Sequence, residues 1–225
     1  MRYRLYIFDL DGTLVDTSPG IIDSVRYVEA AMGFAPLSQE RLGTFIGPPL
    51  EESFARCYDP DPARVQAMVD LYRERYRARG VGNGAIYPGI PEILEEIRAA
   101  GALSAVATLK HHSMTALTLE GFGLASRFDA IAARDDAHPT KASLIRRAME
   151  LLDWTDPSTV LMIGDSRYDG VGAGEAGVDF AALTYGFGFS EPGSLLGLPT
   201  VFTARRPEEL VEFLRECLEG RRAPV

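Results

Sequence analysis

Polar side chains that could do chemistry stand directly after apolar stretches of this sequence. Asp9 and Asp11 follow the first of these stretches. Thr108 follows another stretch, and Asp165 follows a later one. If the stretches are parallel strands, their carboxyl ends meet at one edge of the sheet, which is where open α/β sheets bind ligands. Crowded carboxylates repel one another and need a cation, and Mg²⁺ is the usual hard, oxygen-seeking ion beside a phosphate.

Lys141 is expected at the same edge, in the first turn of a helix that Thr140 can cap. A cation at this end of a helix opposes the helix dipole, at a cost of roughly 0.3–1 kcal/mol, and this mismatch hints at a functional role. Lys110 and Arg134 are alternatives for the cation of the site.

The elements that must position these residues alternate along most of the chain. Repeated βα units with apolar strands are typical of an α/β fold with a doubly wound, Rossmann-like parallel sheet. Strands are expected at 5–8, 102–107, 128–132, 160–163, 179–183 and near 200–203. Helices are expected at 91–100, around 113–120, at 141–152, at about 168–176 and from Pro207 onward.

One long segment interrupts this alternation directly after the first strand. Its helical pattern predicts an inserted α-helical cap domain at 17–82, with a core formed by 1–16 and 83–225. Glycines and prolines in its middle favour a rigid loop, and the glycines at its end favour a linker. Within the insert, the sequence predicts helices over 19–32 and 62–79, a loop over 40–50 and a linker over 80–84.

Composition narrows the class of protein. The 225 residues include 23 Lys and Arg against 32 Asp and Glu, a net charge of −9, which argues against a nucleic-acid partner bound by phosphate neutralisation. Two cysteines are too few for a disulfide framework. No apolar run approaches the roughly 20 residues of a membrane helix, and the N-terminus has no signal-peptide pattern. We therefore expect a cytoplasmic protein with no membrane or nucleic-acid partner, while its oligomeric state stays open.

The motifs resemble those of the haloacid dehalogenase-like (HAD) hydrolases over essentially the whole chain. Residues 8–17, FDLDGTLVDT, are similar to the first motif of that family, and 164–169, GDSRYD, to the fourth. Thr108 fits the second motif and Lys141 the third. The helical insert resembles the cap of the phosphoglycolate phosphatase-type branch. Within that branch, FIGPPL at 45–50 and YPG at 87–89 are similar to a 5'-nucleotidase-like group.

This resemblance implies a Mg²⁺-dependent phosphatase that acts on a small-molecule phosphate ester. Asp9 would attack the phosphorus and form an aspartyl-phosphate. Asp11 would protonate the leaving oxygen and then deprotonate the hydrolytic water. The carboxylates of Asp9 and Asp165 and the backbone carbonyl of Asp11 would hold Mg²⁺, with Asp169 nearby through water.

Other residues are implied to bind the substrate. Thr108 and Lys141 would hold phosphoryl oxygens. Leu109 stands where relatives often carry Ser or Asn, but its backbone N–H can still bind phosphate. Gly12 allows the sharp turn that lets two carboxylates face one phosphate. Gly47 belongs to the rigid cap loop, which would cover the phosphate site as a closing lid does. The alternative is that Pro48 and Pro49 of this loop merely start the next helix.

The resemblance leaves the exact reaction and substrate open. A 5'-nucleotide, phosphoglycolate and a small sugar phosphate present the same phosphate to the core. A phosphomutase would keep all four motifs. A dehalogenase has no use for Asp11, and a non-catalytic binding module would not need a nucleophile paired with an acid.

Three patterns are interpreted as structural rather than functional. The glycine fingerprint at 172–177 falls on a helix that does not directly follow a strand, so small residues for close packing on the sheet are the better reading. His111, His112 and His138 lack the spacing of a metal site and are expected at the surface. The arginine-rich run 73–79 is expected to be a solvated helix face with internal charge pairing, although one arginine could reach the substrate.

Overall fold

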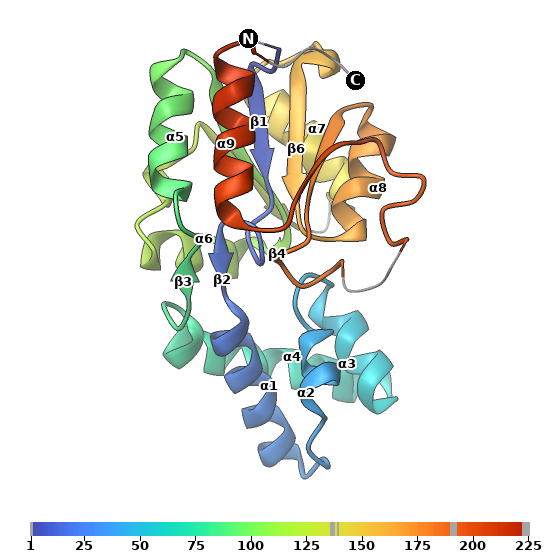
Figure 1. Ribbon diagram of the computed structural model, residues 1–225. Coiled ribbons are helices and arrows are strands. Elements are labelled where there is room, and N and C mark those ends of the chain that lie inside the picture. Colours follow the sequence, from blue (N-terminus) through green and yellow to red (C-terminus); the bar gives the residue numbers. More distant parts are fainter. Residues whose placement is uncertain (1, 136–137, 139, 190–192, 222–225) are drawn as a thin grey trace.

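A six-stranded parallel sheet forms the centre of the computed structural model (Figure 1). The structure describes residues 2–135, 138, 140–189 and 193–221. The strand order β5-β4-β1-β6-β7-β8 places the first strand of the chain between two later ones. The strands of this sheet are β1 (Leu5–Phe8), β4 (Leu103–His111), β5 (Ala130–Arg134), β6 (Val160–Gly164), β7 (Asp179–Leu183) and β8 (Thr200–Ala204).

Helices cover both faces of the sheet, so the expected doubly wound α/β fold is confirmed. Tyr6 and Phe8 of β1 point to the face that α5 and α9 cover, while Leu5 and Ile7 point to the face of α7 and α8. All four side chains are fully buried, as expected for a strand covered on both sides. The helices of this core are α5 (Ile90–Ala99), α6 (His112–Gly121), α7 (Lys141–Leu151), α8 (Arg167–Ala176) and α9 (Pro207–Leu218).

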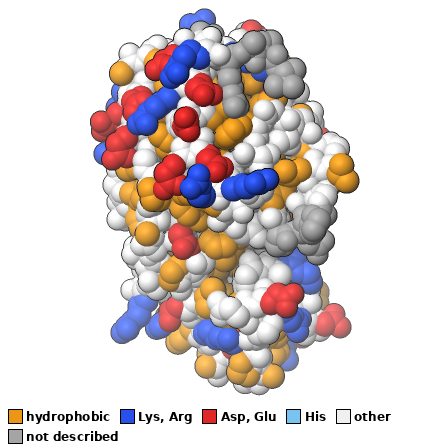
Figure 2. Space-filling model, in the orientation of Figure 1, with side chains coloured by type: hydrophobic (Ala, Val, Ile, Leu, Met, Phe, Trp, Pro, Cys, Tyr) orange, Lys and Arg blue, Asp and Glu red, His pale blue; other side chains and the backbone are white. Residues whose placement is uncertain are grey.

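Acidic and basic side chains are interspersed over α5 and α9 on the face that Figure 2 shows. Arg215 of α9 pairs there with Glu96 of α5 at 2.7 Å. Among the described residues, no helix combines the length and the apolar character that crossing a bilayer requires.

The segment between β1 and α5 is helical and lies beyond the carboxyl ends of the strands (Figure 1). It has an apolar core of its own, in which Phe54 packs edge-to-face on Phe45 and Tyr72. We call this segment the cap. Its helices are α1 (Ser18–Met32), α2 (Gln39–Gly43), α3 (Leu50–Tyr58), α4 (Pro62–Arg75) and a π-helix at Tyr76–Gly80.

Two short strands join the cap to the core. β2 (Val15–Asp16) and β3 (Ala85–Ile86) pair antiparallel where the chain leaves the core and returns to it. The glycine-rich segment at 80–84, expected to be a linker, packs on this connection: the Gly20 N–H donates to the Asn83 carbonyl at 3.0 Å. The two crossing points are therefore tied together by backbone hydrogen bonds.

The prediction of a loop over 40–50 is wrong in part. Residues at its start belong to α2, whose N-cap Ser38 accepts a hydrogen bond from the Arg41 N–H. Only 44–49 lacks regular structure before Leu50 begins α3, with Pro49 as its N-cap. The glycines and prolines of this segment led to the prediction of a loop, so α2 was missed. The alternative that Pro48 and Pro49 start a helix agrees with α3.

The glycine fingerprint lies on α8, as expected, and its Ala173 packs on the sheet. Gly172 of the same stretch makes a further close contact, with α7. A Cβ at Gly172 would lie 2.7 Å from Cβ of Lys141 and 3.0 Å from the Ala142 nitrogen. Gly172 is therefore the residue that lets α8 approach the first turn of α7, from which Lys141 extends.

Gly172→Ala is expected to lower the free energy of unfolding by about 1–3 kcal/mol, because the added methyl group has no room against α7. Gly174→Ala in the same helix is the matched control, since its Cβ would meet only Pro199, at 3.6 Å. The control should be neutral or slightly stabilising, because Ala favours helix over Gly. Urea denaturation of both variants measures the difference, and equal stabilities would contradict this packing.

Candidate active site

The chain turns sharply directly after β1. The Gly12 N–H donates to the Val15 carbonyl at 2.9 Å, and Gly12 has a φ of +82° that favours glycine. A Cβ at this position would collide with the Asp165 carboxylate. Asp9 and Asp11 come directly before this turn and are 4% and 6% exposed, so both carboxylates are held away from bulk water.

Three buried carboxylates cluster at this edge of the sheet, and one ammonium group contacts two of them. Lys141 Nζ lies 2.8 Å from Asp9 Oδ1 and 2.7 Å from Asp169 Oδ1, and it donates to the Ala107 carbonyl at 2.9 Å. Asp9, Asp165 and Asp169 each offer an oxygen within 4.8 Å of the others. Lys141, rather than Lys110 or Arg134, is thus the cation in contact with Asp9.

The crowding of charge shifts the pKa values of these groups. Burial raises the pKa of Asp9 to about 6, although the Lys141 charge opposes the shift. Burial, followed by the charges of Asp169 and Asp9, raises the pKa of Asp165 well above its usual range. Burial alone would lower the pKa of Lys141, but the two neighbouring carboxylates outweigh it and raise that pKa. One lysine does not balance three carboxylates, so the site favours a further cation.

The donor set fits a divalent metal ion. Asp169 Oδ2 is engaged by the N–H and hydroxyl of Ser166, at 3.0 and 2.6 Å. Its other oxygen, Oδ1, is buried and pairs with Lys141 at 2.7 Å, and a carboxylate oxygen can accept more than one contact. Asp165 accepts from the Phe187 N–H at 2.6 Å through one oxygen. Buried carboxylate oxygens with free acceptor capacity are ligands that hard cations prefer.

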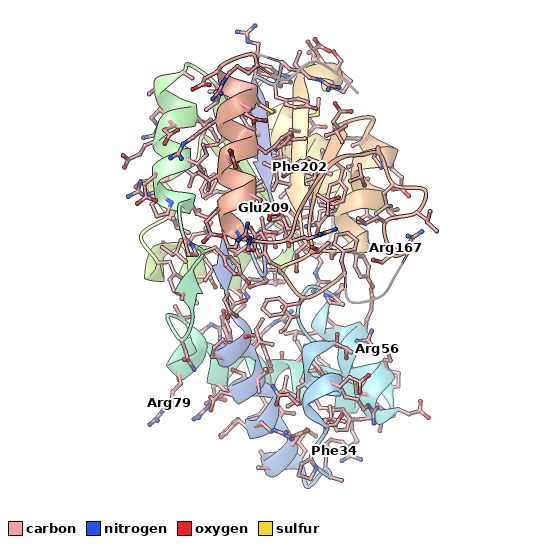
Figure 3. The ribbon with its side chains drawn as sticks, viewed as in Figure 1. Phe34, Arg56, Arg79, Arg167, Phe202 and Glu209 are labelled. Atoms are coloured by element: carbon pink, nitrogen blue, oxygen red, sulfur yellow. The ribbon has the colours of Figure 1, made fainter. Side chains whose placement is uncertain are left out.

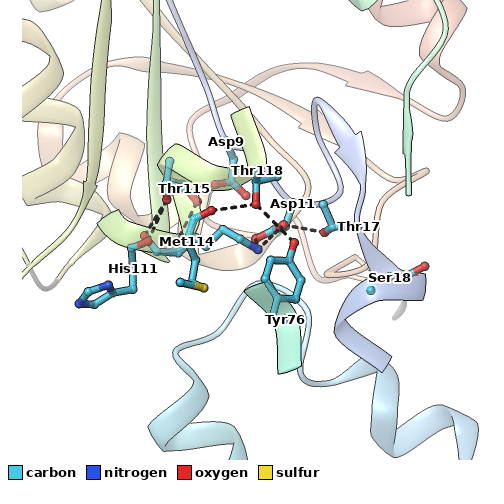
Figure 4. A network of polar contacts seen from close by, with 12 residues as sticks. Asp9, Asp11, Thr17, Ser18, Tyr76, His111, Met114, Thr115 and Thr118 are labelled. Atoms are coloured by element: carbon cyan, nitrogen blue, oxygen red, sulfur yellow. Dashed lines mark hydrogen bonds and ion pairs between the residues drawn. The ribbon is translucent and has the colours of Figure 1, made fainter. Parts of the chain in front are cut away.

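Asp11 is not among the three clustered carboxylates and has a cation of its own. Lys110 Nζ lies 3.0 and 3.1 Å from its two oxygens, and the Thr17 hydroxyl donates to it at 2.5 Å. The ring of Tyr76, from the π-helix of the cap, has its centroid 4.6 Å from Lys110 Nζ. Figure 4 shows Asp11 between Thr17 and Tyr76. The sequence predicts Lys110 only as an alternative to Lys141 for the cation of the site, and this contact with Asp11 was missed.

The expected substrate-binding residues lie along the same edge. Thr108 is buried near the end of β4, directly after the Ala107 carbonyl that Lys141 contacts. Leu109 and Gly47 line a cavity between cap and core that Asp11 also lines. Gly47 has a φ of +101°, so glycine is favoured at this point of the cap loop. The cavity measures about 40 Å³, which is room for a few water molecules.

The arginine-rich run differs from the expected solvated face with internal pairing. Arg75 pairs with Asp23 of α1 at 2.9 Å, and Arg73 pairs with Glu51 of α3 at 3.2 Å. Arg79 extends away from the body of the cap (Figure 3). Arg73 lines the cavity between cap and core. The pairing of Arg73 with Glu51 of α3 has no local signal in the sequence.

The histidines have separate surroundings. His111 lines the same cavity, half-buried, whereas His112 is exposed. His138 hydrogen-bonds Asp135 at 2.8 Å. The surface position expected for all three is therefore wrong for His111, which β4 carries to the boundary with the cap.

Known proteins resemble this chain over nearly its full length. The family model of haloacid dehalogenase-like hydrolases matches residues 6–183. A 5'-nucleotidase of Pseudomonas aeruginosa is 37% identical over 98% of this chain and 97% of its own. A phosphoglycolate phosphatase of Caulobacter vibrioides is 31% identical over 93% and 92%. A haloacid dehalogenase-like family hydrolase from Streptococcus pneumoniae has a solved structure with a TM-score of 0.85, at 31% identity over 94% and 98%.

Lys141→Met is expected to lower the free energy of unfolding by about 3–5 kcal/mol, because it leaves buried carboxylates without their cation. Added divalent metal salt should restore part of the loss. Arg147→Met in the same helix is the control, since its exposed pair with Glu150, at 3.4 Å, contributes little. Chemical denaturation with and without metal measures both effects. A variant as stable as the parent in metal-free buffer would contradict the role given to Lys141.

Proposed function

Because the chain belongs to the haloacid dehalogenase-like hydrolases and its relatives include named phosphatases, we propose that it is a Mg²⁺-dependent phosphomonoesterase that works through an aspartyl-phosphate. The observation that carries the proposal is the contact of Lys141 with Asp9, at 2.8 Å, inside the cluster of buried carboxylates. A buried carboxylate beside a lysine and a metal site suits attack on phosphorus, since phosphoryl transfer is mainly positioning and charge neutralisation.

In the first step, an oxygen of Asp9 attacks the phosphorus of the ester. The bond from phosphorus to the leaving oxygen breaks, and Asp11 gives its proton to that oxygen, so that an alcohol leaves. Lys110 and Thr17, which hold the Asp11 carboxyl, orient it toward the leaving group. Thr108, Lys141 and the Leu109 N–H bind the phosphoryl oxygens.

In the second step, Asp11 takes a proton from water as the water oxygen attacks the phosphorus. The bond between phosphorus and Asp9 breaks, which releases inorganic phosphate and leaves Asp11 protonated again. The carboxylates of Asp9 and Asp165, the Asp11 carbonyl and, through water, Asp169 would hold Mg²⁺. The bound ion supplies positive charge that offsets the charge of the phosphoryl group.

Two substrate classes stay in view. The relative from Pseudomonas favours a 5'-nucleotide, and the relative from Caulobacter favours phosphoglycolate. A phosphomutase of the same fold would return the phosphate to a substrate instead of releasing it. Phosphate release across a panel of phosphomonoesters, with Mg²⁺ and with excess chelator, tests the proposal. Full activity in chelator would contradict the metal requirement.

Asp9→Asn is expected to reduce turnover by roughly 10⁴-fold or more, because an amide is a poor nucleophile. The change is nearly isosteric, so circular dichroism should show an unchanged fold. Phosphate release by carefully purified variant and parent protein is the measurement. Retained activity would exclude the covalent mechanism.

Asp11→Asn is expected to reduce hydrolysis of an alkyl phosphate by about 10²- to 10⁴-fold, the usual contribution of a general acid. p-Nitrophenyl phosphate should lose less in the first step, because its leaving group needs no proton. Rapid-quench detection of phosphoenzyme from each ester compares the two. Equal losses would show that Asp11 is not the acid.

A further inference from the structure

The cavity between cap and core that Asp11 and Leu109 line has a group of cations separate from Lys141. Arg73 comes from α4 of the cap, and Arg134 stands at the end of β5. Both line the cavity together with Lys110 and His111. The side chains of Arg73 and Arg134 are 17% and 20% exposed, so most of each is shielded from solvent.

One carboxylate bridges the two arginines. Glu51 accepts from Arg73 at 3.2 Å and from Arg134 at 2.9 Å, one through each oxygen. Glu51 belongs to α3 and is absent from the lining of the cavity, whereas both arginines belong to it. Each guanidinium has five N–H donors, so the bridge leaves donors of both arginines free to bind a ligand.

A polar atom of Arg73 stays unsatisfied in this arrangement. Its Nε is buried and has no hydrogen-bond partner within the described part of the chain. Buried donors without a partner are uncommon and costly, so such an atom calls for a ligand or a water molecule.

The local charge is opposite to that of the whole chain. Arg73, Arg134 and Lys110 bring three positive charges to the cavity, against the carboxylates of Glu51 and Asp11. Burial, followed by the charge of Arg73, lowers the pKa of His111, as expected in a positive field. A chain with a net charge of −9 therefore concentrates cations at this boundary.

The cluster of arginines lies close to the atoms that would hold the transferred phosphate. Arg134 Nε donates to the Leu109 carbonyl at 3.1 Å, and Leu109 directly follows Thr108. Lys110, next in the chain, contacts Asp11. Asp11, the proposed acid for the leaving group, lines the cavity together with both arginines, so the leaving group of an ester held at Asp9 is expected on their side. The small cavity favours a compact group there.

We propose that Arg73 and Arg134 form a second anion subsite, which selects short phosphomonoesters whose leaving group carries a carboxylate or a second phosphate. This inference rests on the proposed phosphomonoesterase activity and deepens it. It favours a small anionic substrate over a 5'-nucleotide, whose leaving nucleoside is neutral and large. The competing interpretation is that the two arginines and Glu51 only tie the cap to the core.

The test compares matched substrates that differ in the group at the proposed subsite. Phosphoglycolate carries a carboxylate, ethane-1,2-diol bisphosphate a second phosphate, and ethyl phosphate neither. The parent protein should prefer the anionic esters over ethyl phosphate in kcat/KM. Arg73→Met should lower kcat/KM for the anionic esters by about 10- to 100-fold, as for the loss of a charge-assisted contact, and leave ethyl phosphate nearly unchanged.

The variant Glu51→Gln distinguishes substrate selection by the two arginines from a purely structural contact between cap and core. It removes the carboxylate that competes for the arginines, so KM for the anionic esters should fall, opposite to the effect of Arg73→Met. If the two arginines and Glu51 only tie the cap to the core, both variants should change kcat/KM of all the esters in the same direction. Arg75→Met is the matched control on the same helix, because Arg75 pairs with Asp23 and does not line the cavity. It should behave as the parent protein.

Calorimetric binding to the Asp9→Asn variant tests the subsite independently of turnover. Phosphoglycolate should bind more tightly than ethyl phosphate, and adding Arg73→Met should remove the difference. Equal affinities of the two ligands, or equal losses for both on Arg73→Met, would overturn the subsite. If no ester is hydrolysed by the parent protein but the affinity difference persists, the proposed activity fails and the subsite stands.

Discussion

Lys141 and the three carboxylates around it are the interaction on which the rest of the structure depends. Like charges at this distance, shielded from water, repel strongly unless cations offset them. Two strands and two helices converge to hold the cluster: Asp9 follows β1, Asp165 follows β6, and Lys141 and Asp169 lie in the first turns of α7 and α8. The fold holds together a group of charges that would separate in solution, which gives the site its capacity for a metal ion.

Small residues make this convergence possible. Gly172 allows α8 to approach the first turn of α7, and Gly12 leaves space for the Asp165 carboxylate. The small residues on α8 thus serve packing, both on the sheet through Ala173 and on the helix that carries the site lysine through Gly172. The stability of the fold and the arrangement of the site depend on the same close contacts.

Much of the core could be predicted from the sequence, because its signals are local. The strand that ends at Phe8, the turn at Gly12 and the Thr140 cap of α7 each follow from neighbouring residues. A short helix, α2, was missed where glycine and proline dominated the pattern. The contacts of Lys110 with Asp11 and of Glu51 with Arg134 join residues 99 and 83 positions apart, and charge alone does not specify such partners.

The most direct test of the account is a crystal structure of the protein with Mg²⁺ and beryllium trifluoride, a mimic of a phosphoryl group bound to a carboxylate. We expect the beryllium on an oxygen of Asp9, with the metal ion in contact with Asp9 and Asp165 and with the Lys141 ammonium group in contact with the fluorides. A metal ion bound away from these carboxylates, or a fluoride adduct on any residue other than Asp9, would contradict it.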